Sequence, residues 1–230
     1  AIGFGPNLPL GTSAADGETV VFTATTSGEI PKNQRIYWRS KVYESYDDAT
    51  WQEGEQKQLL LEPGTEFIQP IGIPGEIIAT YRVKASLPLG DYFFPGELIS
   101  INNPANFIYS LQDDGGRDII AVEPENTILS GNSYRIQVLI KPAEEAALIG
   151  NIIEIPAWIN KRYLQVPESI FPKVQDLAQR ITLGKTTNYE KTVAVTNYLR
   201  SNFEYQEELD VPENTRDRIE WFLFEGKKGY

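Results

Sequence analysis

The sequence predicts an α+β fold, in which an antiparallel, β-sandwich-like region precedes a helical region. As far as about Lys141, short runs rich in β-branched and aromatic residues are separated by turn signals such as Pro63-Gly64 and Pro95-Gly96. After about Pro167, apolar residues recur at helical spacing instead. No helical pattern lies between the early strands, so a doubly wound parallel sheet is not expected.

The strands of the first region are predicted from their residue types and from alternation. Residues 18–26 are rich in Val, Phe and Thr, and residues 35–46 alternate between bulky and charged side chains, although Ser40 interrupts the alternation. Tyr46 to Trp51 reads as a strand, a turn with aspartates and a second strand. Further strands are predicted at 58–61, 77–85, 97–101, 107–111, 118–122 and 133–140.

Three helices are predicted near the C-terminus, after a helical turn at 143–148 and a mixed connector at 152–163. Apolar residues from Ile170 to Ile181 fall on one helical face. Thr187 and Glu190 form a capping-box pair at the start of the second helix. A third, short helix is expected at 216–225, with Asn214 or Thr215 as its cap. The predicted domains are therefore a β-rich domain at 1–145, a connector at 146–166 and a helical part at 167–230.

The charge and composition of the chain narrow the classes of partner. The net charge is −11, from 32 acidic and 21 basic residues, and such a surface repels a phosphate backbone. No nucleic-acid partner is expected. The chain also contains no run of the roughly 20 apolar residues that a membrane helix needs.

Three residue types are absent, namely Cys, His and Met. Without Cys and His, this chain contains neither a thiol nucleophile nor an imidazole base. Without Met, it is expected to be an excised fragment or a processed product. Residues 113–118 combine aspartates with glycines, but they lack the ligand spacing of an EF-hand. No metal site and no cofactor are expected.

The end of the chain carries the most informative motif. A short aromatic helix with Phe222-Leu223-Phe224 leads to a basic turn and then to Gly229-Tyr230. Here the chain resembles the bacterial transglutaminase-like enzymes, a cysteine protease-like family in which a Phe-Leu-Phe helix and a basic turn precede Gly-Tyr-Cys.

The resemblance extends along most of the chain. The segments that resemble the family, in order, are Tyr37-Trp38-Arg39, Tyr46 to Trp51, Tyr163-Leu164-Gln165-Val166-Pro167, Val174 to Ala178 and Asn197 to Tyr205. Phe203 stands where the family has a tyrosine. Together with the C-terminal motif, these matches span about residues 35–230.

The resemblance implies that the helical part is the first half of a papain-like or transglutaminase-like core. It also implies a nucleophilic cysteine immediately after Tyr230, with the His and Asp of its triad further along the chain. Phe222, Leu223, Phe224, Gly229 and Tyr230 would then flank the nucleophile, and the fragment itself would be inactive. The resemblance further implies a membrane-anchored enzyme whose corresponding part lies outside the cytoplasm and whose substrates are peptides or proteins.

Two alternatives remain open at this point. The β-rich region could be a binding or adhesion module that the helices cap. The chain could also belong to a catalytically dead scaffold, which only the residues after Tyr230 would distinguish from an enzyme.

Overall fold

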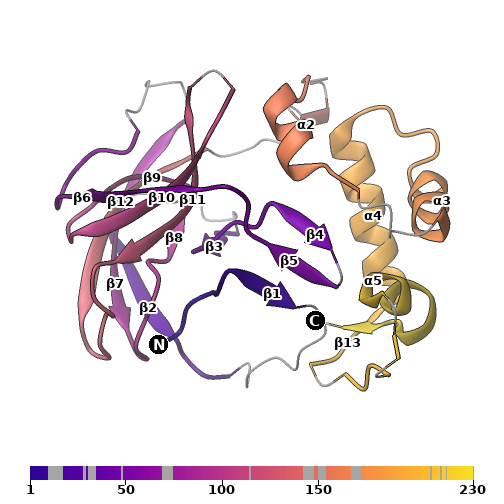
Figure 1. Ribbon diagram of the computed structural model, residues 1–230, viewed down its shortest axis with the longest axis horizontal. Coiled ribbons are helices and arrows are strands. Elements are labelled where there is room, and N and C mark those ends of the chain that lie inside the picture. The colour runs from indigo at the N-terminus through magenta and orange to yellow at the C-terminus, as the bar shows by residue number, and fades with distance from the viewer. Residues whose placement is uncertain are drawn as a thin grey trace. The chain divides into compact units, whose positions relative to one another are not determined.

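The structure of the protein, a computed structural model, falls into two compact units, each built from separate stretches of the chain (Figure 1). The first unit consists of Ala1–Pro6, Glu18–Tyr43 and Glu53–Pro142, and the second of Asn7–Gly17, Glu44–Gln52 and Ala143–Tyr230. The structure describes residues 1–9, 18–27, 30, 35–47, 49–68, 75–113, 115–141, 148–149, 154–166, 172–207, 209–212, 214–215 and 217–229.

The first unit contains antiparallel sheets, as the sequence predicted. One sheet has four strands in the order β2-β7-β12-β9, and a second has three in the order β11-β10-β6. A short pair joins β3 to β8. The strands are β2 (Phe22–Ser27), β3 (Trp38–Arg39), β6 (Lys57–Leu61), β7 (Ile77–Ala85), β8 (Phe94–Pro95), β9 (Glu97–Ile101), β10 (Ala105–Leu111), β11 (Arg117–Pro124) and β12 (Ser133–Ile140).

A single buried cluster joins the inner faces of the two larger sheets. It includes Val83 of β7 and Ile136 of β12 from one sheet, and Phe107 of β10 and Val122 of β11 from the other. In β7 every second residue from Ala79 to Ala85 is buried, which is the pattern of a strand with one face on a core. The predicted β-sandwich is therefore confirmed for this unit.

The long strand predicted at 35–46 was wrong. The structure has only β3 and, after a break, the short strand β4 (Ser45–Asp47). The interruption at Ser40 marks this break, where the Ser40 side chain is buried and Lys41 makes an isolated bridge to Ala121. Trp38 packs against Phe22 and Tyr81 with both ring centroids 5.2 Å away, so it is a packing residue.

The second unit combines a small sheet with helices. Its antiparallel sheet has the order β1-β5-β4, and its parallel pair joins β13 to β14. In chain order the unit contains β1 (Asn7–Pro9), β4, β5 (Thr50–Gln52), α2 (Ala157–Tyr163), α3 (Pro172–Ile181), α4 (Asn188–Asn202), β13 (Glu204–Tyr205), α5 (Arg218–Trp221), the π-helix η1 (Phe222–Gly226) and β14 (Lys228–Gly229).

The grouping of the second unit differs from a simple division along the sequence. The strand-turn-strand of β4 and β5 lies in the same unit as the helices, although more than a hundred residues separate them in the chain. The division predicted at 1–145, 146–166 and 167–230 stays a prediction. The connector predicted at 152–163 contains helix α2, because Pro156 precedes the helix instead of interrupting it. The helical turn predicted at 143–148 lies largely outside the described residues.

None of the helices in the described part of the chain is long and apolar enough to cross a membrane.

Candidate functional site

Helix α4 leads into the segment that the C-terminal motif singles out. Its start is fixed by the predicted capping box: the Glu190 N–H donates to Thr187 Oγ1 at 3.1 Å, and the Thr187 N–H donates to Glu190 Oε2 at 3.0 Å. The backbone N–H groups of Thr187 and Thr186 both donate to the Glu190 carboxylate, and these two hydrogen bonds lower the pKa of Glu190 to about 2. The helix ends at Asn202, so Phe203 begins the extended segment that follows.

The short helix α5 begins at Asp217, whose carboxylate joins two parts of the unit. Asp217 Oδ1 accepts a hydrogen bond from the Glu220 N–H at 2.9 Å, and Oδ2 accepts one from the Tyr46 hydroxyl at 3.3 Å. Asp217 and Tyr46 are both buried. Tyr46 also packs against Trp51, its cross-strand partner, with 5.3 Å between ring centroids. The cap predicted at Asn214 or Thr215 was wrong, because Asp217 caps the helix.

The chain continues from α5 into a π-helix, where the sequence had predicted an ordinary helix to residue 225. The Lys227 N–H donates to the Phe222 carbonyl at 3.0 Å, which closes the wider turn. Lys227 itself adopts the left-handed conformation, with φ of 50°. Single π-helical turns are frequent at functional sites. The segment thus changes direction at Lys227, just before the Gly-Tyr step.

Aromatic rings cover the two glycines of this segment. A Cβ at Gly226 would lie 2.5 Å from the Trp221 ring, and a Cβ at Gly229 would lie 2.9 Å from the Phe222 ring. Phe222 is stacked in turn on Phe203, with 4.6 Å between centroids. Gly229 is outside the left-handed region, and the turn is made by Lys227. Gly229 is required for close approach instead.

A parallel strand pair holds the backbone after the turn. The Glu204 N–H donates to the Lys227 carbonyl at 3.0 Å, and the Gln206 N–H donates to the Gly229 carbonyl at 2.7 Å. Glu204 is paired with Lys228, and Tyr205 with Gly229. These bonds fix the direction in which the chain leaves position 229.

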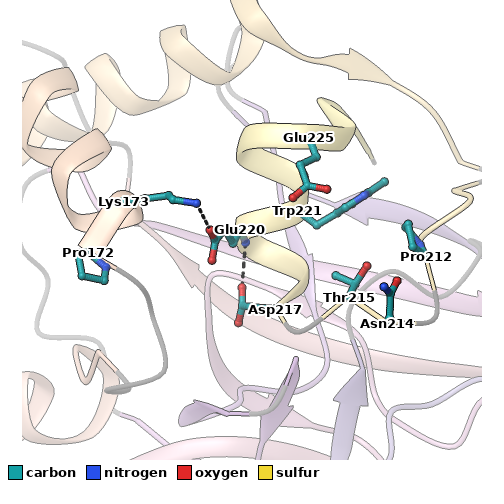
Figure 2. Close-up of a pocket in the computed structure, with 9 residues that line it drawn as sticks. All are labelled: Pro172, Lys173, Pro212, Asn214, Thr215, Asp217, Glu220, Trp221 and Glu225. Carbon is teal, nitrogen blue, oxygen red and sulfur yellow. Dashed lines mark hydrogen bonds and ion pairs between the residues drawn. The ribbon is translucent and has the colours of Figure 1, made fainter.

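A cleft of about 670 Å³ lies beside the start of α5, within the same unit. Figure 2 shows Lys173 reaching from α3 to Glu220, where Nζ and Oε1 are 2.8 Å apart. This contact raises the pKa of Lys173. Trp221 and Glu225 extend into the cleft from the next turns (Figure 2). Asp217 and Glu220 already have hydrogen-bond or ion-pair partners, so the cleft presents the Trp221 indole and the Glu225 carboxylate to a ligand. These groups are suited to orienting a ligand rather than to making or breaking its covalent bonds.

The structure brings the predicted motif residues partly together. Phe222, Leu223 and Phe224 lie in the π-helix and are half-buried, and the Phe222 ring lies against Gly229. Tyr230 is outside the described residues. That the five motif residues flank a nucleophile stays a prediction. The contact between Tyr46 and Asp217 was missed. Tyr46 lay in the predicted strand-turn-strand and Asp217 in the helix predicted at 216–225, but neither local pattern predicts their contact.

The described residues contain no group of three or more Cys, His, Asp or Glu side chains that could hold a metal ion.

Two family models match the chain. Residues 1–144 match the model described as the TgpA N-terminal domain. Residues 175–230 match the model of the transglutaminase-like superfamily. The second match contains α4, α5, the π-helix and the parallel strand pair, so it covers the whole of the C-terminal segment described above.

The chain is also similar to individual proteins. The chain is 41% identical over 71 residues to YebA of Bacillus subtilis strain 168, described as an uncharacterized protein; the match covers 30% of the chain and 10% of YebA. The chain thus spans about a tenth of that curated relative. Two crystal structures of the periplasmic domain of TgpA from Pseudomonas aeruginosa share its fold. One has a TM-score of 0.57 at 16% identity, and its match covers 100% of this chain and 73% of that chain. The other, bound to ethylmercury, has a TM-score of 0.54 at 17% identity, and its match covers 100% of this chain and 74% of that chain.

Proposed function

Because the chain belongs to the TgpA N-terminal domain family and continues into a transglutaminase-like segment, we propose that it is part of a thiol enzyme that acts on amide groups. The proposed nucleophile is a cysteine directly after Tyr230, and the proposed base and its orienting carboxylate are a His and an Asp further along. The chain from 1 to 230 has neither Cys nor His, so alone it would be inactive.

The observation that carries the proposal is the anchored backbone at Gly229. The Gln206 N–H donates to the Gly229 carbonyl at 2.7 Å, and the Phe222 ring, itself stacked on Phe203, packs against Gly229. The backbone that leads to the residue directly after Tyr230, two positions after Gly229, is therefore held in place. Such positioning matters because small displacements of a nucleophile cost rate.

The proposed reaction is acyl transfer through a thioester. The cysteine thiolate attacks the carbonyl carbon of a substrate amide, and the protonated His gives its proton to the departing nitrogen. The neutral His then takes a proton from an amine or from water as that group attacks the thioester, and the thiolate is restored. In this scheme the described residues position the nucleophile, whereas the substrate carbonyl reacts with groups beyond Tyr230.

The proposed substrate is a peptide or protein, and the proposed site of action is outside the cytoplasm, in a protein anchored to the membrane. The location is supported by the fold shared with a periplasmic domain from Pseudomonas aeruginosa. The substrate class is supported by the resemblance to amide-directed thiol enzymes and by the open cleft beside α5. No nucleic-acid partner is proposed, because the net charge is −11.

Incorporation of a fluorescent primary amine into a glutamine-containing protein tests the activity. The full-length protein should label the acceptor, and replacement of the cysteine after Tyr230 by alanine should abolish labelling. Release of ammonia without amine incorporation would indicate hydrolysis through the same thioester. A full-length protein that is folded but inactive in both assays would favour a catalytically dead scaffold.

A further inference from the structure

The outer face of the four-stranded sheet carries a patch of positive charge and hydroxyl groups on an otherwise acidic protein. The register places Thr25 of β2, Arg82 of β7 and Arg135 of β12 in one row across three strands. The adjacent rows contain Thr23, Lys84 and Ser133 on one side and Ser27, Thr80 and Gln137 on the other. None of these outward-facing residues is acidic, although the chain has 32 acidic residues.

The pairing of Arg82 with Arg135 is electrostatically unfavourable on its own. The two residues are direct cross-strand neighbours, both are exposed, and like charges in this position destabilise a sheet. Within the described part of the chain, neither guanidinium has a hydrogen bond or ion pair to an acidic side chain. A bound anion between the two guanidinium groups would remove the repulsion.

The two arginines also line a common hollow. It has a volume of about 340 Å³, and its described lining consists of hydroxyl residues and the two arginines: Thr25, Thr26, Ser27, Thr80, Arg82 and Arg135. All of these side chains can donate hydrogen bonds, and no carboxylate is among them. A hollow with this lining favours an anion over a cation or an apolar ligand.

The number of donors favours phosphate over carboxylate. Each guanidinium presents a planar fork that donates to two acceptor sites, so two forks are matched better by the three terminal oxygens of a phosphate group than by the two oxygens of a carboxylate. The hydroxyl groups of Thr25 and Thr80 can bond the remaining lone pairs. Three cations fall short of the roughly four to eight that hold a protein on an anionic membrane, so a discrete ligand fits better than a lipid surface.

We propose that this hollow on the outer face of the β2-β7-β12 strands is a binding site for a phosphate group on a discrete ligand. The site lies in the first unit and goes beyond the acyl-transfer chemistry proposed for the second. Its occupation would neutralise the Arg82–Arg135 pair and link the β-sandwich to a phosphate-bearing molecule. The proposal can therefore fail while the proposed enzyme activity stands, and the reverse also holds.

Titration of the chain with inorganic phosphate at constant ionic strength tests the site, with amide NMR shifts as the readout. Saturable shifts are expected on β2, β7 and β12. Arg82→Gln or Arg135→Gln should weaken binding about tenfold or more, as expected for loss of a charge-assisted group. Lys84→Gln is the matched control, because it removes one positive charge from the same face but outside the hollow. It should change the affinity by less than about threefold.

Two further readouts complete the test. Without phosphate, the Arg82→Gln variant should melt at a temperature equal to or above that of the native chain, because the substitution relieves the repulsion. Addition of phosphate should raise the melting temperature of the native chain and of the Lys84→Gln variant, but not that of the Arg82→Gln variant. Absence of saturable binding would overturn the proposal. So would equal losses for Lys84→Gln and Arg82→Gln, or binding to phosphatidylglycerol vesicles without binding of inorganic phosphate.

Discussion

Two glycines in the C-terminal segment are needed because aromatic rings lie against the backbone. Gly226 contacts the ring of Trp221, and Gly229 contacts the ring of Phe222. Neither glycine adopts a positive φ, so their role is steric. The sequence identified Gly229 as part of a motif, but the reason for the glycine depends on ring positions that no local pattern predicts.

Gly226→Ala should lower the free energy of unfolding by about 1–3 kcal/mol, because its Cβ would overpack against Trp221. Urea denaturation provides the measurement. In a Trp221→Leu background the smaller side chain leaves room, so the added cost of Gly226→Ala should fall below about 1 kcal/mol. An equal cost in both backgrounds would show that the ring is not the cause.

Glu123 provides a prediction for pH. Burial raises its pKa, the charges of Asp91 and Glu53 add to the effect, and Lys41 opposes it. The folded state therefore binds more protons than the unfolded state at pH values between the ordinary pKa of 4.5 and the raised one. Stability contributed by this group is present below the ordinary pKa and decreases as pH rises through that window.

Glu123→Gln should thus stabilise the protein at pH 7 relative to the native chain, and the difference should shrink toward pH 4. Denaturant melts at the two pH values measure this. A Glu123→Gln variant whose relative stability falls as pH rises would contradict the expected direction of the pKa shift.

At the scale of elements, the sequence predicted the regular strands well. The segments 77–85, 97–101 and 133–140 coincide with β7, β9 and β12, because alternation and β-branched residues agree there. Helix α4 was found from its capping box. The π-helix was not predicted, since its residues fit an ordinary helical pattern.

The capping box of α4 can be tested by replacing threonine with alanine at the cap and, as a control, inside the helix. Thr187→Ala removes the side chain that accepts the Glu190 N–H and should cost about 1 kcal/mol of unfolding free energy. Thr192→Ala, at an exposed position inside the same helix, should be neutral or stabilising because alanine favours the helix. Equal effects of the two substitutions, measured by urea denaturation, would argue against the cap.

At the scale of the whole molecule, segments that are far apart in the sequence are in contact. The strand-turn-strand of β4 and β5 joins the helical unit, and Tyr46 bonds Asp217 across 171 residues. Local patterns predicted both segments but not their contact. Such contacts depend on tertiary packing, which is why the fold class could be predicted from sequence and the unit composition could not.

Tyr46→Phe should lower the unfolding free energy by about 1 kcal/mol, because a buried hydrogen bond to Asp217 is lost. In an Asp217→Ala background the same substitution should cost close to nothing. Tyr205→Phe serves as the control, since that residue is exposed and its hydroxyl bonds only the half-buried Glu207 among the interactions described. It should stay within about 0.5 kcal/mol of the native chain. Full additivity of the Tyr46 and Asp217 substitutions would disprove the coupling.

The proposed enzyme activity depends on a cysteine nucleophile that follows Tyr230. Its sharpest test is treatment of the active full-length protein with a thiol-directed inhibitor, followed by peptide mapping of the modified residue. We expect one adduct, on a cysteine directly after Tyr230, that forms in step with the loss of amine incorporation. An active protein with another residue at that position, or with its activity lost through modification elsewhere, would overturn the assignment.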